Sequence, residues 1–263
     1  CIISFRGNVA AKTVVGYQTQ DWMDKTFYMM GCQFEKPDGA DILLSELTFN
    51  FDMANVPKYD KGGNYKKVAP NVQLAFADSE GNTPYYFISD AKKVNGVYVP
   101  GWVGATGSAA DPAVSAGIGF WFKDPTTDNP VLQTTGQVLP DSPWEKTFGA
   151  ATYYMLVNPF PVSYDLSDTT AVLFNGIDDS APKYDKEGNY KKVATQIQVP
   201  FVDSEGFTPY YYISDAKKVN GVYVPGWVTT TGKDAGTITV PAGRGCWFRP
   251  AVANMKVSFF LGK

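Results

Sequence analysis

The sequence predicts an all-β chain made of two tandem homologous β-sandwich or barrel-like domains, residues 1–135 and 136–263. A phrase of the sequence, "TPYYFISDAKKVNGVYVPGWV", begins at Thr83 and returns 125 residues later with one change, Phe87 to Tyr212. Such a long internal match indicates a duplicated structural unit. The composition, with 15% aromatic residues, 25 Gly and 18 Pro, is typical of sheets joined by turns.

Short apolar segments bounded by Gly, Pro, Asn or Asp predict the strands of each copy. In the first copy these segments are residues 25–34, 72–77, 84–89, 96–103 and 119–123. Asn95-Gly96 offers the positive φ angles that close a tight β-hairpin. The stretch Ser89 to Lys92 is therefore expected in a hairpin loop. Brief helix is expected only around residues 41–47 and 164–168.

The two copies share further motifs near their ends. The second copy has Asn158-Pro-Phe-Pro after an apolar strand and closes on Gly243-x-Gly-Cys-Trp-Phe, and the first closes on Gly117-x-Gly-Phe-Trp-Phe. This order resembles a tandem β-repeat module of secreted and surface bacterial proteins. The first copy departs from it, with Gly31-Cys-Gln-Phe in place of the Asn-Pro-Phe turn. The resemblance implies an extracellular or cell-surface β-module with no general catalytic activity.

Composition argues against most hydrolase designs and against several partners. The chain has no His, which removes His-based triads, His general bases and His metal ligands. The acidic turns are expected to cap the backbone, and the sequence predicts no cofactor and no metal ligand set, although calcium binding by these turns stays open. The net charge is −3 and the lysines occur in isolated pairs, so nucleic acid is not an expected partner. No apolar run is long enough to predict a membrane span.

Aromatic residues of the repeated hairpin are the predicted contacts for a ligand or partner, because Tyr and Trp make stacking platforms and interface anchors. The alternative is that these residues only cover the sheet of each domain and bind nothing. The predicted contact residues are Tyr85, Tyr86, Tyr98 and Trp102 in the first copy, and Tyr210, Tyr211, Tyr223 and Trp227 in the second.

The chain ends suggest assembly by strand addition. The C-terminal phrase, residues 257–263, repeats a phrase at residues 3–9 that opens the first copy and one at residues 132–138 that joins the copies. We therefore expect a terminal strand to complete a sheet in a neighbouring molecule. The residues predicted to make this contact are Ile3, Phe5, Val257, Phe259 and Leu261.

Cys1 leaves three interpretations open: a lipid-bearing residue, a thiol for an intermolecular disulfide, or the point at which the chain happens to begin. The cysteine count is odd, at three, so at least one thiol has no partner within the chain.

The leading prediction is a non-enzymatic structural protein that forms a surface layer, appendage or filament by binding copies of itself head to tail. The alternative is a tandem carbohydrate-binding surface protein, in which two aromatic faces gain avidity from duplication.

Overall fold

The computed structural model describes residues 15–21, 27–76, 81–139, 143–201 and 206–261, and it confirms the all-β class. The chain groups into two compact units, Cys1–Ala75 with Gly81–Pro140 and Phe76–Glu80 with Asp141–Lys263. The first unit runs past the predicted boundary at 135/136 because strand β10 (Val131–Gln137) pairs within it. That the units are independent domains stays a prediction.

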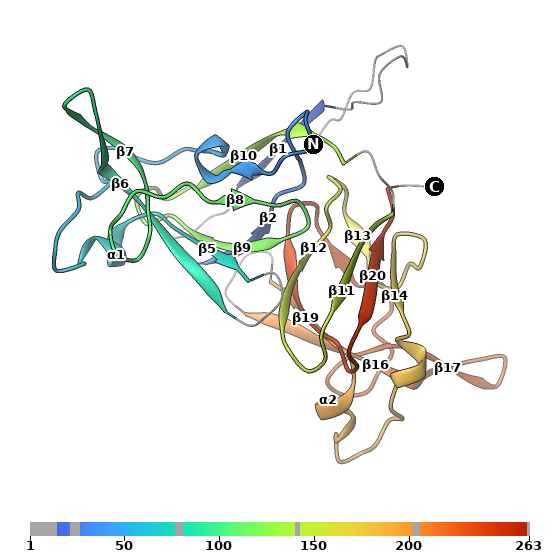
Figure 1. Ribbon diagram of the computed structural model, residues 1–263. Helices are drawn as coiled ribbons and strands as arrows, with labels where there is room; N and C mark the ends of the chain where they lie inside the picture. The colour runs from blue at the N-terminus through green and yellow to red at the C-terminus, as the bar shows by residue number, and fades with distance from the viewer. Residues whose placement is uncertain (1–14, 22–26, 77–80, 140–142, 202–205, 262–263) are drawn as a thin grey trace, which may run out of the picture. The chain divides into compact units, whose positions relative to one another are not determined.

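Unit 1 contains a five-stranded antiparallel sheet, a three-stranded antiparallel sheet and a two-stranded ladder (Figure 1). The five-stranded sheet has the order β2-β9-β5-β6-β7, the three-stranded sheet β1-β10-β4, and the ladder β3-β8. The remaining strands of this unit are β1 (Val15–Asp21), β2 (Tyr28–Gly31), β3 (Ile42–Leu43), β4 (Thr48–Phe49), β5 (Asn71–Ala75), β6 (Asn82–Val94), β7 (Val97–Val103), β8 (Ala113–Val114) and β9 (Gly119–Lys123).

Unit 2 repeats the same three sheets with equivalent strands in the same order. Its sheets have the orders β12-β19-β15-β16-β17, β11-β20-β14 and β13-β18. The strands are β11 (Trp144–Phe148), β12 (Tyr154–Val157), β13 (Tyr164–Asp165), β14 (Val172–Asn175), β15 (Gln196–Pro200), β16 (Phe207–Val219), β17 (Val222–Val228), β18 (Thr239–Val240), β19 (Gly245–Arg249) and β20 (Met255–Phe259).

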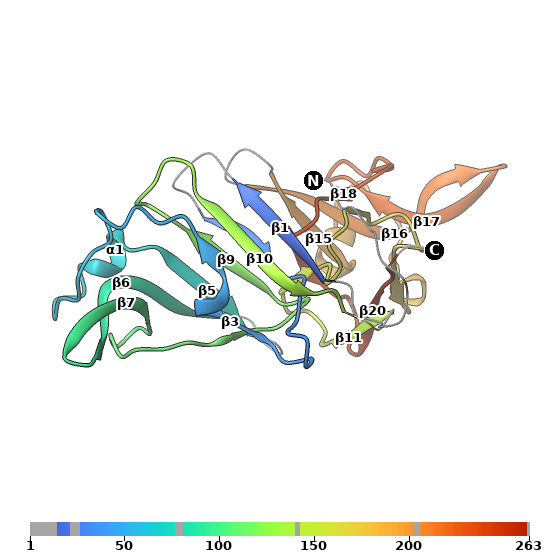
Figure 2. The same cartoon turned by 90° about the horizontal axis from the view of Figure 1, so that it is seen from above.

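The main core of each unit lies between the five-stranded and the three-stranded sheet. In unit 1, Phe49 of β4 packs against Phe122 and Trp102 of the larger sheet, with ring centroids 4.8 and 5.5 Å apart. Phe174 of β14 makes the equivalent contacts in unit 2. This face-to-face packing of aromatic side chains gives each unit a sandwich-like arrangement, which Figure 2 shows for unit 1 from above.

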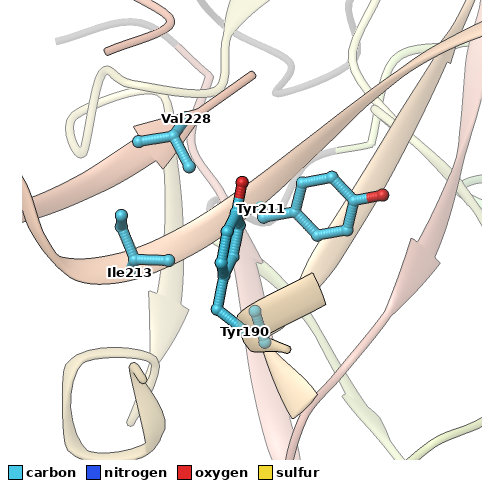
Figure 3. Close-up of a cluster of buried hydrophobic side chains, with 5 residues drawn as sticks. Tyr190, Tyr211, Ile213 and Val228 are labelled. Carbon is cyan, nitrogen blue, oxygen red and sulfur yellow. The ribbon is translucent and has the colours of Figure 1, made fainter. Parts of the chain in front are cut away.

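A second, smaller cluster covers the opposite face of each five-stranded sheet. In unit 2, Tyr190 meets Tyr211 edge to face at 5.7 Å, and Ile213 and Val228 complete the cluster. Figure 3 shows the Tyr190 ring standing between Tyr211 on one side and Ile213 and Val228 on the other. The five-stranded sheet is therefore covered on both faces near its centre.

Short helices carry these second clusters, at places that the sequence did not predict. Helices α1 (Tyr65–Val68) and α2 (Tyr190–Val193) begin where Asp60 and Asp185 accept the backbone N–H groups of Tyr65 and Tyr190 at 2.9 and 2.8 Å. Hydrogen bonds from the backbone hold the pKa of both carboxyls below the ordinary value of 3.8.

Of the two brief helices expected, the one near residues 41–47 is strand β3 followed by a short 3₁₀ helix, Leu44–Glu46, and the one near residues 164–168 is strand β13. In the described residues, no helix has the length and apolar character that a membrane crossing requires.

The C-terminal strand is paired on both edges inside its own unit, which corrects the prediction that this strand completes a sheet in a neighbouring molecule. Strand β20 lies between β11 and β14, and Val257 and Phe259 are fully buried. Leu261 lies beyond the strand and is exposed. A strand with partners on both edges and its apolar side chains in the core cannot pair with a sheet of a neighbouring molecule unless the unit opens. Cys1, Ile3 and Phe5 lie outside the described residues.

Candidate functional site

Each unit projects one long β-hairpin, β6–β7 in unit 1 and β16–β17 in unit 2 (Figure 1). The first hairpin closes at Asn95 and Gly96, with φ angles of 49° and 85°, and the second has nearly the same angles at Asn220 and Gly221. Two successive residues with positive φ are the signature of the tight turn predicted from Asn-Gly. This prediction is confirmed in both units.

The stretch Ser89 to Lys92 lies within strand β6, where the pairing with β7 shifts register, and not in the predicted loop. The Ser89 hydroxyl donates to the Pro57 carbonyl at 3.2 Å, and Asp90 accepts the N–H of Tyr59 at 2.7 Å. The equivalent bonds recur in unit 2. Both polar side chains therefore anchor a neighbouring backbone segment.

Beyond this anchor, the end of each hairpin is exposed. We call residues 92–98 and 217–223 the hairpin tips; their sequences are identical. Val97 and Tyr98 are 66% and 63% exposed, and their counterparts in unit 2 are 65% and 60% exposed. Lys93 lies over the ring of Tyr98, 5.5 Å from its centroid. Each tip thus offers apolar and basic side chains at a convex hairpin end.

The prediction that Trp102 and Trp227 are exposed contacts for a ligand or partner is wrong, because each side chain is only 4% exposed. Both side chains lie on the sheet face that packs against the three-stranded sheet, where Phe49 and Phe174 cover them. They contribute to the core.

The predicted tyrosines also lie mostly within the fold. Tyr86 packs edge to face on Tyr65 at 5.7 Å, and Tyr211 is buried in the equivalent cluster. Tyr85 and Tyr210 are half-buried. Of the predicted aromatics, Tyr98 and Tyr223 at the tips are the exposed pair.

A cavity, which we call hollow 1, lies at the base of the first hairpin. Its volume is about 620 Å³. Phe51 and Phe87 form its aromatic wall, with ring centroids 4.5 Å apart. The charged side chains lining it are Lys92 and Asp111, and Asp111 accepts two hydrogen bonds from Ser45. Hollow 1 is therefore mainly apolar, with charge near zero.

The equivalent cavity in unit 2, hollow 2, has a volume of about 410 Å³ and a different chemistry. The hydroxyl of Tyr212 donates to Asp178 at 2.5 Å. Burial and this hydrogen bond raise the pKa of Tyr212 above its ordinary value. Asp179 and Asp234 also line the hollow, and Lys217 lies 4.0 Å from Asp234. Three carboxylates against one ammonium group make hollow 2 acidic.

The single difference between the two copies of the repeated 83–103 phrase falls in these hollows. Phe87 packs on Phe51 in hollow 1, whereas Tyr212 bonds to Asp178 in hollow 2. At the position equivalent to Phe51, unit 2 has Gly176. The hairpin tips are thus identical while the cavities beside them differ.

The remaining motif residues have structural roles. In the Asn-Pro-Phe-Pro turn, Asn158 accepts the N–H of Phe160 at 3.0 Å and donates to the carbonyl of Val162 at 2.9 Å. Burial raises the pKa of Cys32 to about 11 and that of Cys246 to about 12, so neither thiol is activated as a nucleophile. Among the residues that the structure describes, no cluster of three or more Cys, Asp or Glu is placed to hold a metal ion.

No family model, curated protein or solved structure matches this chain.

Proposed function

We propose that this protein is a non-enzymatic structural protein that assembles with copies of itself, and that its hairpin tips make the contacts. The observation that carries the proposal is the exposure of Val97, Tyr98 and their unit 2 counterparts at the ends of tightly turned hairpins. Exposed apolar groups that gather at one place favour a partner surface over water.

The shape and repetition of the tips favour a protein partner over a sugar. A convex hairpin end cannot enclose a sugar ring, but it can insert into a concave surface. The two tips have the same sequence and nearly the same turn angles. An assembly needs at least one tip of each copy to contact another copy. We place this assembly outside the cell or on its surface, as the surface-module resemblance implies.

Sedimentation velocity of tip variants tests this proposal. We replace Val97 and Tyr98, with their counterparts Val222 and Tyr223, by Thr, which has high strand propensity but removes the apolar methyl group and the aromatic ring. Removing hot-spot side chains typically costs about 2 kcal/mol or more of binding free energy. The variant is expected to sediment as a smaller species than the unchanged chain.

A matched control uses exposed apolar residues outside the tips. Val68 and Val193 are 53% and 58% exposed at equivalent positions on α1 and α2. Replacing both by Thr should leave the sedimentation profile unchanged. If the tip variant and the control behave alike, or if the unchanged chain shows no association, the tips are not assembly contacts.

Carbohydrate binding is the second candidate, and hollow 2 is the feature that favours it. An aromatic side chain beside carboxylates can stack on a sugar ring and accept its hydroxyl hydrogens. Tyr212, Asp178 and Asp179 supply this combination in hollow 2, whereas the carboxylate of hollow 1, Asp111, already accepts two hydrogen bonds from Ser45. Calorimetric titration with a panel of soluble glycans, using Tyr212→Phe as the comparison, would detect such binding.

A further inference from the structure

We infer that the β6–β7 tip of one copy docks into hollow 2 of a second copy. This inference rests on the proposed self-assembly, and it adds the surface that receives the tip. It also makes the contact directional, because the donor is unit 1 and the acceptor is unit 2.

The first argument is the match of shape and apolar character. The tip is convex and presents Val97 and Tyr98, which are more than half exposed. Hollow 2 is concave, and at about 410 Å³ it falls within the range of about 300–1,000 Å³ that is usual for binding pockets. Leu173 and Pro225 line it beside the phenol ring of Tyr212. Insertion would remove apolar surface from water on both partners.

Charge selects hollow 2 over hollow 1. The tip carries Lys92 and Lys93, both exposed. Hollow 2 has a carboxylate excess from Asp178, Asp179 and Asp234, whereas hollow 1 has no such excess. Complementary charges speed the encounter of two surfaces and fix their register. A basic tip that approached hollow 1 would meet no excess of negative charge there.

Charge also selects the first tip over the second. Lys217 of the second tip already lies 4.0 Å from Asp234 of its own unit. At the position equivalent to Asp234, unit 1 has Ala109, and Lys92 makes no salt bridge with a described residue. Although the apolar residues of the two tips are identical, the lysines of the first tip are therefore not held in a salt bridge with any residue that the structure describes, whereas Lys217 of the second tip is.

A contact between unit 1 of one copy and unit 2 of the next uses two different surfaces. Such a heterologous contact leaves one tip and one hollow free at the ends of every pair. Further copies can then add, so the assembly closes into a ring or extends as a filament. A chain that used one surface against itself would stop at a dimer.

Disulfide trapping in a Cys1→Ser background tests the inference. A chain with Val97→Cys is mixed with a tagged chain with Asp179→Cys under mild oxidation, and a cross-linked species containing one of each is expected. Ala54 stands in unit 1 where unit 2 has Asp179, so Ala54→Cys in the tagged chain is the matched control. The control is expected to cross-link about tenfold less, and equal trapping at both positions would overturn the inference.

Three further outcomes, read together with the association state of the unchanged chain, separate this inference from the proposed function. If Val97→Cys chains cross-link mainly to each other, the tips meet tip to tip, which overturns the docking but supports tip-based assembly. If nothing cross-links while the unchanged chain associates, hollow 2 is not the acceptor. If the unchanged chain does not associate at all, the proposed function itself fails.

A charge exchange provides a second, independent test. Lys93→Glu should weaken association about tenfold, and Asp179→Lys should do the same. Mixing the two variants brings the opposite charges together again and should restore association between them. Failure of this rescue would overturn the docking geometry. If a soluble glycan added to the unchanged chain displaces the tip from hollow 2, hollow 2 is instead a sugar site.

Discussion

Deletion of residues 255–263 removes the central strand of a sheet, and we expect it to unfold unit 2. Met255 and Phe259 of β20 are almost fully buried, and truncation of such side chains typically costs about 2–5 and 3–5 kcal/mol respectively. The deletion also removes the backbone ladders to β11 and β14. The total reaches or exceeds the stability of a typical domain, about 5–15 kcal/mol.

Circular dichroism and limited proteolysis measure this outcome. The deleted chain should lose part of its cooperative thermal transition, and protease should cut within unit 2 while unit 1 persists. Deletion of residues 261–263 alone is the control, because it leaves β20 intact. If the longer deletion gives a fully folded chain that merely fails to assemble, β20 is a donated strand and its assignment to the unit 2 core is wrong.

Three further predictions concern the core, hollow 2 and pH. Trp102→Ala should lower the free energy of unfolding by about 3–5 kcal/mol in urea titrations, because the side chain is buried in the core. A loss below 1 kcal/mol would place it at the surface. Tyr212→Phe should lower that free energy by about 2 kcal/mol, since one hydrogen bond to the Asp178 carboxylate is lost while Phe87 already occupies the equivalent position; a loss well above about 3 kcal/mol would show that hollow 2 is part of the core. Because the folded pKa of Asp60 is lowered, its stabilisation is present above pH 3.8 and is lost as pH falls through the folded pKa. Asp60→Asn should therefore reduce the acid dependence of the urea midpoint, and an unchanged pH profile would contradict that role.

The hairpins could be predicted from sequence because their signal is local. Asn95 and Gly96 set the turn by their own backbone preferences, and the flanking residues pair directly across it. The all-β class follows in the same way from short apolar segments between turn residues. Such features depend little on the rest of the chain.

The environment of the tryptophans could not be predicted, because it depends on distant partners. Side chains along the strand that contains Trp102 point alternately to the two faces of the sheet. Because the five-stranded sheet is covered on both faces, this alternation does not distinguish core from surface. Phe49, which covers it, is 53 residues away in sequence. The pairing of β20 with β11 and β14 is similarly non-local, which is why its sequence resembled a free strand.

The hollows could also not be predicted from the sequence. Phe87 and Tyr212 were visible as the one change in the repeated phrase, but their partners Phe51 and Asp178 come from segments that match poorly between the copies. The difference acquires a chemical meaning only when those segments are placed beside the hairpin.

A dilution series of the unchanged chain, followed by static light scattering, tests the central claim of self-assembly most directly. The chain has a mass of 28.8 kDa. Tip contacts predict a weight-average mass above this value that rises with protein concentration and falls with added salt, because basic tips meet an acidic hollow. A mass that stays at 28.8 kDa across the whole concentration range would contradict the account.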